Sequence, residues 1–136
     1  MKRFLLDTNV VSELRKPKPH GAVLAWMRSR ADEELYVSAV TLGALQAGVE
    51  ELRKRDDAKA SEIEAWVDRL AATVQVLPMD GACFREWARL MSSKSDELVE
   101  DAMIAATARV HRLTVATRNR KDFESLDVAL VNPFAP

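Results

Sequence analysis

Cysteine is nearly missing from this sequence: Cys83 is the only one in 136 residues, which excludes an internal disulfide. Long apolar runs are missing too. The first one, Phe4-Leu5-Leu6, ends at Asp7 and is far shorter than a signal-peptide core or a membrane-spanning helix. No repeat, low-complexity tract or Gly/Ser linker interrupts the chain. We therefore expect one cytoplasmic domain over residues 1–136, large enough to bury a substantial core.

The sequence also has no strong excess of charge of either sign. Lysine and arginine number 20, aspartate and glutamate number 21, and the net charge is -1. This balance excludes the strong basic field with which many proteins hold nucleic acid, so a polyanion would need a local patch. Two short basic groups offer such a patch, although solvated surface charge explains them equally well. They are Arg15, Lys16 and Lys18, and Arg118, Arg120 and Lys121.

Short apolar runs alternate with segments of helical spacing along the whole chain. Thr8 is expected to cap the first helix, and Ser38 or Thr41 the helix that runs towards Lys54. Strands separated by helices pair in parallel, so the pattern predicts a three-layer α/β/α domain with a central parallel sheet of four to five strands. The expected strands are residues 1–6, 35–37, 74–77, 113–116 and 128–131, and the expected helices begin near residues 8, 20, 38, 57, 80 and 96.

Two aspartates occupy positions where a charge is poorly solvated. Asp7 directly follows the first buried strand. Asp101 lies on the same side of its helix as Ala105 and Ala108, where an apolar residue is expected. In a parallel α/β sheet, ligands bind beyond the carboxyl ends of the strands. Asp7 and residues 117–122 follow such ends, and the start of the helix that carries Asp101 reaches the same edge, so we expect the acids to converge.

Carboxylates in a small pocket need a cation or protons to offset their repulsion. Oxygen ligands suit Mg²⁺ or Mn²⁺, whereas zinc would need thiolates or paired imidazoles, and the two histidines belong to different helices. A divalent ion held here would activate a water molecule and polarise a phosphoryl oxygen, which permits phosphodiester hydrolysis without a protein nucleophile. Thr8, Ser38, Thr117 and Asn119 would orient carboxylates or water, although helix capping by itself better explains Thr8 and Ser38. Arg118 or Lys121 would hold a backbone phosphate.

Two other interpretations of the acids stay open. In the first, they are helix caps and surface charges of an α/β domain without a metal site. In the second, the chain is a phosphotransfer domain on a similar sheet, either a receiver domain or a haloacid-dehalogenase-like phosphatase. The former needs an acidic pair before its phosphorylated aspartate and the latter needs Asp-x-Asp after the first strand, so Asp7-Thr8-Asn9 fits neither well.

Five motifs occur in order across nearly the whole chain. They are Asp7-Thr8-Asn9-Val10-Val11-Ser12-Glu13-Leu14, Val37-Ser38-Ala39-Val40-Thr41-Leu42-Gly43, Asp101-Ala102-Met103-Ile104-Ala105-Ala106-Thr107-Ala108, Thr117-Arg118-Asn119-Arg120-Lys121-Asp122-Phe123 and Val131-Asn132-Pro133-Phe134. Each motif is weakly specific by itself. The ordered set closely resembles the PIN-domain family, especially the VapC-type toxins of type II toxin–antitoxin systems and their FitB-like branch.

This resemblance implies a Mg²⁺-dependent or Mn²⁺-dependent endoribonuclease that cuts RNA, in some members tRNA. It also implies a homodimer kept silent by a VapB-like antitoxin. By position, Asp7 and Asp101 would be the main metal ligands, with Asn119, Asp122 and Thr8 completing the catalytic group. The candidate RNA-binding residues are Arg15, Lys16, Arg118 and Lys121.

The chain departs from the family pattern at one position. The family motif Thr-Leu-Gly-Glu-Leu is present as Thr41-Leu42-Gly43-Ala44-Leu45, so Ala44 has a methyl group where the pattern has a carboxylate. We interpret this as an inactivating substitution, engineered or natural, and expect weak RNA cleavage or none. The alternative is a nuclease-dead module that binds antitoxin or RNA without turnover.

Overall fold

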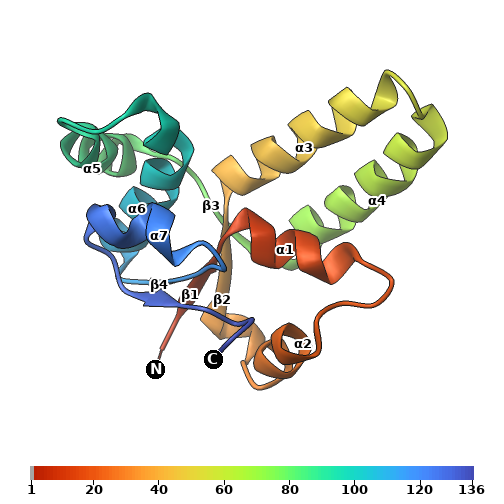
Figure 1. The fold of residues 1–136 in the computed structure, drawn as a ribbon, viewed down its shortest axis with the longest axis horizontal. Coiled ribbons are helices and arrows are strands. Elements are labelled where there is room, and N and C mark those ends of the chain that lie inside the picture. Colours follow the sequence, from red (N-terminus) through yellow and green to blue (C-terminus); the bar gives the residue numbers. More distant parts are fainter. Residues whose placement is uncertain (1) are drawn as a thin grey trace.

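The computed structural model describes residues 2–136, which contain one parallel sheet with helices around it (Figure 1). The strand order is β3-β2-β1-β4-β5, and every neighbouring pair is parallel. The predicted parallel α/β fold is therefore confirmed. The first strand begins at Phe4, and Met1, where we expected it to begin, lies outside the described residues. The strands are β1 (Phe4–Leu6), β2 (Leu35–Ser38), β3 (Gln75–Leu77), β4 (Thr114–Ala116) and β5 (Leu130–Val131).

Helices connect the strands at nearly all the positions that the sequence predicts. They are α1 (Thr8–Arg15), α2 (Gly21–Arg28), α3 (Ala39–Arg53), α4 (Asp57–Thr73), α5 (Gly81–Met91), α6 (Val99–His111) and α7 (Arg120–Phe123), with short 3₁₀ turns at Asp32–Glu34, Asp96–Leu98 and Glu124–Leu126. The sequence reasoning missed α7, because four residues are too few to establish a helical period.

The cap of α1 differs from the prediction. Asp7 caps this helix, and its carboxylate accepts a hydrogen bond from the backbone N–H of Thr8 at 2.8 Å. Extended backbone continues one residue beyond β1 to Asp7, so Thr8 is already the first helical residue. The predicted cap of α3 is confirmed, because the Ser38 hydroxyl accepts from Val40 N at 3.0 Å.

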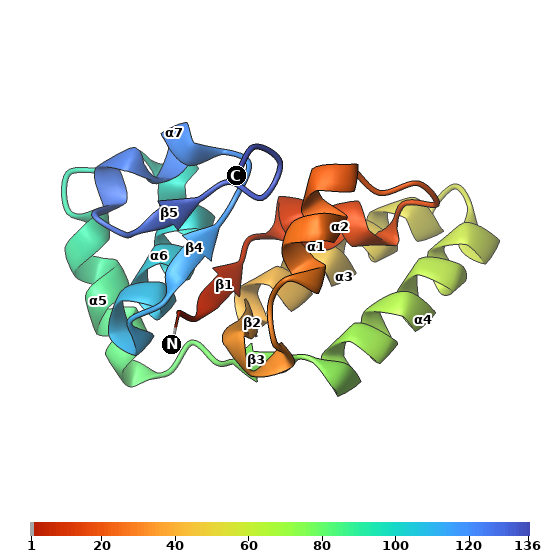
Figure 2. The same cartoon turned by 90° about the horizontal axis from the view of Figure 1, so that it is seen from below.

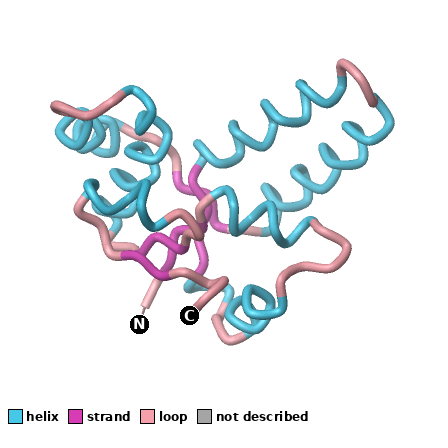
Figure 3. Tube along the Cα trace, in the orientation of Figure 1, coloured by secondary structure: helices cyan, strands magenta, loops and turns pink. Residues whose placement is uncertain are grey.

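The core consists of two apolar layers on opposite faces of the sheet. Alternate residues of β1 belong to different layers: Leu5 packs with Ile104 of α6, whereas Phe4 and Leu6 pack with α1 and α2 residues including Trp26. Helices α5 and α6 lie on one side of the sheet, with α1 and α2 on the other (Figure 2). The strands are gathered in the middle of the molecule (Figure 3). This arrangement brings the carboxyl ends of β1 and β4 together in a rigid setting.

Helices α3 and α4 pair with each other and extend away from the sheet (Figure 1). Val49, Ala60 and Val67 form a separate buried cluster between them. Among the described residues, no helix has the length and apolar character needed to cross a bilayer.

Candidate active site

Asp7 is the most tightly held carboxylate at the carboxyl edge of the sheet. Its side chain is only 5% exposed. One oxygen, Oδ1, accepts from Thr8 N, and the other, Oδ2, accepts from Thr117 Oγ1 at 2.8 Å and from Asn9 Nδ2 at 3.0 Å. The neighbouring strands β1 and β4 end in register, with Leu6 beside Ala116, so the residues that follow them are adjacent. The sheet register therefore fixes the orientation of this carboxylate.

Asn9 and Thr117 also fix the segment that follows β4. Thr117 Oγ1 accepts from the backbone N–H of Asn119 at 3.0 Å, and Asn9 Oδ1 accepts from the backbone N–H of Arg118 at 3.1 Å. The sequence reasoning assigned no role to Asn9. Its position two residues after the strand end, beside an aspartate, was the only available signal. The structure shows that it links α1 to the loop before α7.

Asp101 lies in the first turn of α6 and is partly buried, as its helical position predicts. Burial raises its pKa from the usual 3.8 to about 6, and the negative charges of Asp7, Asp122 and Glu100 add to this effect. Burial also raises the pKa of Asp7, although hydrogen bonds from Thr117, Thr8 and Asn9 oppose the change, and the charge of Asp122 contributes a smaller rise. The charges of Asp7, which follows β1, and of Asp122 on α7 thus both act on Asp101 of α6.

Ala44 lies one helical turn beyond Thr41 on α3, so the two residues share a face of that helix. The Thr8 hydroxyl donates to Thr41 Oγ1 at 3.2 Å, which joins the start of α1 to the start of α3. Because Thr8 adjoins Asp7, this contact places the face of α3 that carries Ala44 beside the acidic site. Ala44 is half-buried.

The predicted basic residues differ in how far their charge is neutralised. Lys16 forms an ion pair with Glu13 at 2.9 Å. Within residues 2–136, no carboxylate lies within ion-pair distance of Arg15, Arg118, Arg120 or Lys121, and all four are exposed. Residues 118–122 line an open hollow that contains three of these cations together with Asp122. The first of these residues, Arg118, directly follows Thr117, which donates a hydrogen bond to Asp7.

The donor set at the acidic site suits a hard divalent cation. Asp7 and Asp101 offer carboxylate oxygens, and Asn119 and Asp122 are exposed beside them. Mg²⁺ commonly takes one or two protein carboxylates and keeps water as its other ligands. Among residues 2–136, no group of three acidic, histidine or cysteine side chains is close enough to bind one ion jointly. The chemistry of Asp7 and Asp101 fits such an ion, with water supplying its other ligands.

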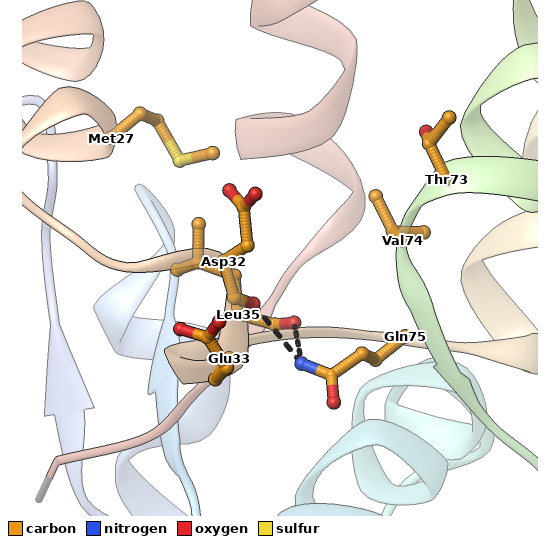
Figure 4. Close-up of a pocket in the computed structure, with 7 residues that line it drawn as sticks. All are labelled: Met27, Asp32, Glu33, Leu35, Thr73, Val74 and Gln75. Atoms are coloured by element: carbon orange, nitrogen blue, oxygen red, sulfur yellow. Dashed lines mark hydrogen bonds between the residues drawn. The ribbon is translucent and has the colours of Figure 1, made fainter.

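A second hollow lies at the opposite end of the strands. It is found where β2 and β3 begin, so it is separate from the acids at the carboxyl edge. Figure 4 shows the side chains that line it. Gln75 spans part of it, since Gln75 Nε2 donates to the backbone oxygens of Asp32 and Leu35, each at 3.1 Å. The hollow is lined by Met27, Asp32, Glu33, Leu35, Thr73, Val74 and Gln75.

These observations define a class of protein. It is a parallel α/β domain with the strand order β3-β2-β1-β4-β5 and with acidic residues at the carboxyl ends of the strands. The PIN domain family matches residues 4–129. Toxin FitB of Neisseria gonorrhoeae is 38% identical over 137 residues, which cover 96% of this chain and 98% of that protein. VapC ribonuclease Y4jK of Sinorhizobium fredii is 38% identical over 139 residues, which cover 98% and 99%.

Solved structures of other proteins have the same fold as this chain. The crystal structure of FitAcB from Neisseria gonorrhoeae matches with a TM-score of 0.82 and 33% identity, covering 98% of this chain and 99% of that one. DNA-bound VapBC from Salmonella typhimurium matches with a TM-score of 0.77 at 21% identity, over 98% and 99% of the two chains, which is a likeness of fold alone. The chain belongs to the PIN domain family.

Proposed function

We propose that the chain is the toxin of a toxin–antitoxin pair and a divalent-metal-dependent endoribonuclease that hydrolyses RNA phosphodiester bonds. The observation that carries this proposal is the buried, triply hydrogen-bonded Asp7, whose charge adds to the effect of burial in raising the pKa of Asp101 to about 6. Such a pair is unfavourable without a cation. The names of the relatives support the same activity, since Y4jK is called a VapC ribonuclease and FitB a toxin.

Asp7 and Asp101 would hold Mg²⁺ or Mn²⁺, with Asn119 and Asp122 at the rim of the site. When bound, the ion supplies an activated water and polarises the phosphoryl group. The protein contributes orientation: Thr117 and Asn9 fix Asp7 through hydrogen bonds, so its ligand oxygens need little rearrangement. Thr8 acts indirectly, because its hydroxyl joins α1 to α3. The exposed cations Arg118 and Lys121 would hold the RNA backbone near these acids, with Arg15 and Lys16 further along.

Ala44 makes this chain an impaired form of the enzyme. A glutamate at this position would add a carboxylate to the face of α3 that adjoins Thr8 and Asp7. The alanine removes that charge, so we expect weaker cation binding and slower cleavage. Ala44 also favours a second candidate function, a nuclease-dead module that binds antitoxin or RNA without turnover.

One experiment separates these two functions. RNA cleavage is compared among the chain as written, Ala44→Glu and Ala44→Gln, with Mg²⁺, Mn²⁺ or excess EDTA. Ala44→Gln is the matched control, because it adds a side chain of the same size without charge. We expect Ala44→Glu to raise metal-dependent cleavage by about 10²-fold or more, and Asp7→Asn in that background to abolish the gain. No cleavage in any of the three forms would contradict the enzyme assignment and leave the binding module. Metal-independent cleavage would refute the metal site, and equal rates of cleavage in all three forms would refute the role assigned to position 44.

The partners are proposed on the same basis. Solved structures of similar fold include FitAcB, DNA-bound VapBC and a toxin-antitoxin complex from Klebsiella pneumoniae. We propose a VapB-like antitoxin for this chain, a cytoplasmic location and a homodimer. Sedimentation of the purified chain, alone and with the product of the adjacent small reading frame, tests both assemblies. A monomer that does not bind that product at micromolar concentration would contradict them.

A further inference from the structure

Phe134, near the C-terminus, packs against two groups from distant parts of the chain. The guanidinium carbon of Arg118 lies 4.5 Å from the centre of the Phe134 ring. The imidazole of His20 meets the same ring edge-on, with the ring centres 5.4 Å apart. A turn holds the phenylalanine in place, because Asn132 Oδ1 accepts from Phe134 N at 2.9 Å. The C-terminal segment thus joins the start of α2 to the loop after β4.

This contact is continuous with the hydrogen bonds around Asp7. The backbone N–H of Arg118 donates to Asn9 Oδ1, and Asn9 Nδ2 donates to Asp7. On the other side, the buried carboxylate of Glu13 accepts from the backbone N–H of His20 at 2.9 Å. Both residues that contact the phenylalanine ring are therefore hydrogen-bonded to α1, which begins at the acidic site. The position of the ring is fixed relative to Asp7 by contacts from three separate segments.

The charge of Arg118 is free to bind an anion. The residue is exposed, and in the part of the chain that the structure describes it forms no ion pair. A guanidinium over an aromatic face keeps its in-plane N–H groups available, and these match the geometry of a phosphate. Stacking also restricts the rotamers of the arginine before it binds, which reduces the entropy that binding would cost.

We propose that Phe134 is a positioning residue that holds Arg118 ready to bind a backbone phosphate of the RNA beside the metal site. This inference rests on the proposed ribonuclease function. The ring acts through the arginine and does not itself contact RNA. His20 contacts the ring edge-on, and Glu13 holds the backbone of His20.

Binding is tested with a fluorescein-labelled, single-stranded oligoribonucleotide and the full chain, with Ca²⁺ in place of Mg²⁺, over a series of salt concentrations. Arg118→Gln should weaken binding by about tenfold at low salt. It should also make the slope of the logarithm of the association constant against the logarithm of the salt concentration shallower by about 0.7, which corresponds to the loss of one phosphate contact. Phe134→Leu, which keeps apolar bulk, should weaken binding about two- to fivefold. Phe134→Trp, which keeps an aromatic face, should bind like the parent.

The decisive measurement is the double variant. Because the ring acts through the arginine, Phe134→Leu should cost nothing further once Arg118→Gln is present. If Phe134→Leu weakens RNA binding equally in the parent and in the Arg118→Gln variant, the ring stacks on RNA directly or only stabilises the fold. That result would overturn the inference. Matched controls are Phe84→Leu, an exposed aromatic residue on α5, and Arg55→Gln, an exposed arginine beyond the end of α3; both should bind like the parent.

The same data separate this inference from the proposed function. If the parent binds the oligoribonucleotide and the Phe134 variants do not differ from it, only the positioning role is lost. If the parent does not bind it at any salt concentration, the RNA substrate and the positioning role are both refuted. In the Ala44→Glu background, Phe134→Leu should raise KM with kcat nearly unchanged, whereas a general loss of folded protein would lower the apparent kcat.

Discussion

Replacing Asp101 with asparagine should stabilise the metal-free protein at neutral pH. Asp101 is partly buried and lies near the charges of Asp7 and Asp122, and these effects raise its pKa from 3.8 to about 6. A rise of that size corresponds to ~3 kcal/mol at about 1.4 kcal/mol per pKa unit. Because the side chain is partly exposed, solvent screening reduces the expected gain to ~1–2 kcal/mol.

The gain should depend on pH in one direction. The folded protein binds the Asp101 proton more tightly than the unfolded chain does, so this aspartate's contribution to stability is fully present below about pH 3.8 and is lost as the pH rises through about 6. The asparagine variant carries no titrating group at this position and would show no such loss. Urea unfolding in EDTA should therefore show the variant more stable than the parent at pH 7 and nearly equal to it close to pH 4.

A matched control is Asp68→Asn on α4, an exposed aspartate that forms no ion pair among the described residues. It should change stability little at either pH. If Asp101→Asn destabilises the protein at pH 7, or shifts it equally at both pH values, the acids do not repel one another as argued. If Asp101 is a Mg²⁺ ligand as proposed, adding Mg²⁺ should reverse the order at pH 7, because the variant lacks that carboxylate.

Three further predictions concern the site and its support. Mg²⁺ should raise the thermal midpoint of Ala44→Glu more than that of Ala44→Gln; equal shifts in a thermal melt would argue against a carboxylate ligand at that position. Thr117→Val should cost ~1–3 kcal/mol in urea unfolding because it leaves Asp7 with one fewer hydrogen bond, and a cost near zero would mean that this bond is not structurally important. Ile104→Ala should cost ~2–5 kcal/mol because Ile104 is 1% exposed in the core cluster on the α6 face of the sheet; a smaller loss would show that this core relaxes around the cavity.

Much of the fold could be predicted from local pattern. The apolar run before Asp7 and the helical spacing around Asp101 predicted their elements because burial selects residues with the period of the element. The helix at Arg120–Phe123 was not predicted, because its four residues are too few to show a helical period. The cap of α1 was misassigned by one residue, because Asp7 and Thr8 are both good cap residues and only the extent of β1 decides between them.

The site was predictable in part. Parallel strand order and the poor solvation of Asp7 and Asp101 predicted that both lie at one edge of the sheet. The charge of Asp7 contributes to the raised pKa of Asp101, and their joint role in holding a metal ion stays a prediction. The role of Asn9, which donates to Asp7 and accepts from Arg118 N, could not be predicted, because its bond to Arg118 joins residues more than a hundred positions apart. The same holds for Phe134, whose contact with Arg118 depends on how the last residues pack after β5.

The sequence by itself determined the five strands and the longer helices, and which acids are poorly solvated, because these follow from local spacing and burial. The tertiary structure alone decided how the site is held. Register between β1 and β4 places Thr117 against Asp7, and packing of the C-terminal segment places Phe134 under Arg118. Hydrogen bonds and aromatic contacts of this kind depend on distances between remote segments, which no local pattern contains.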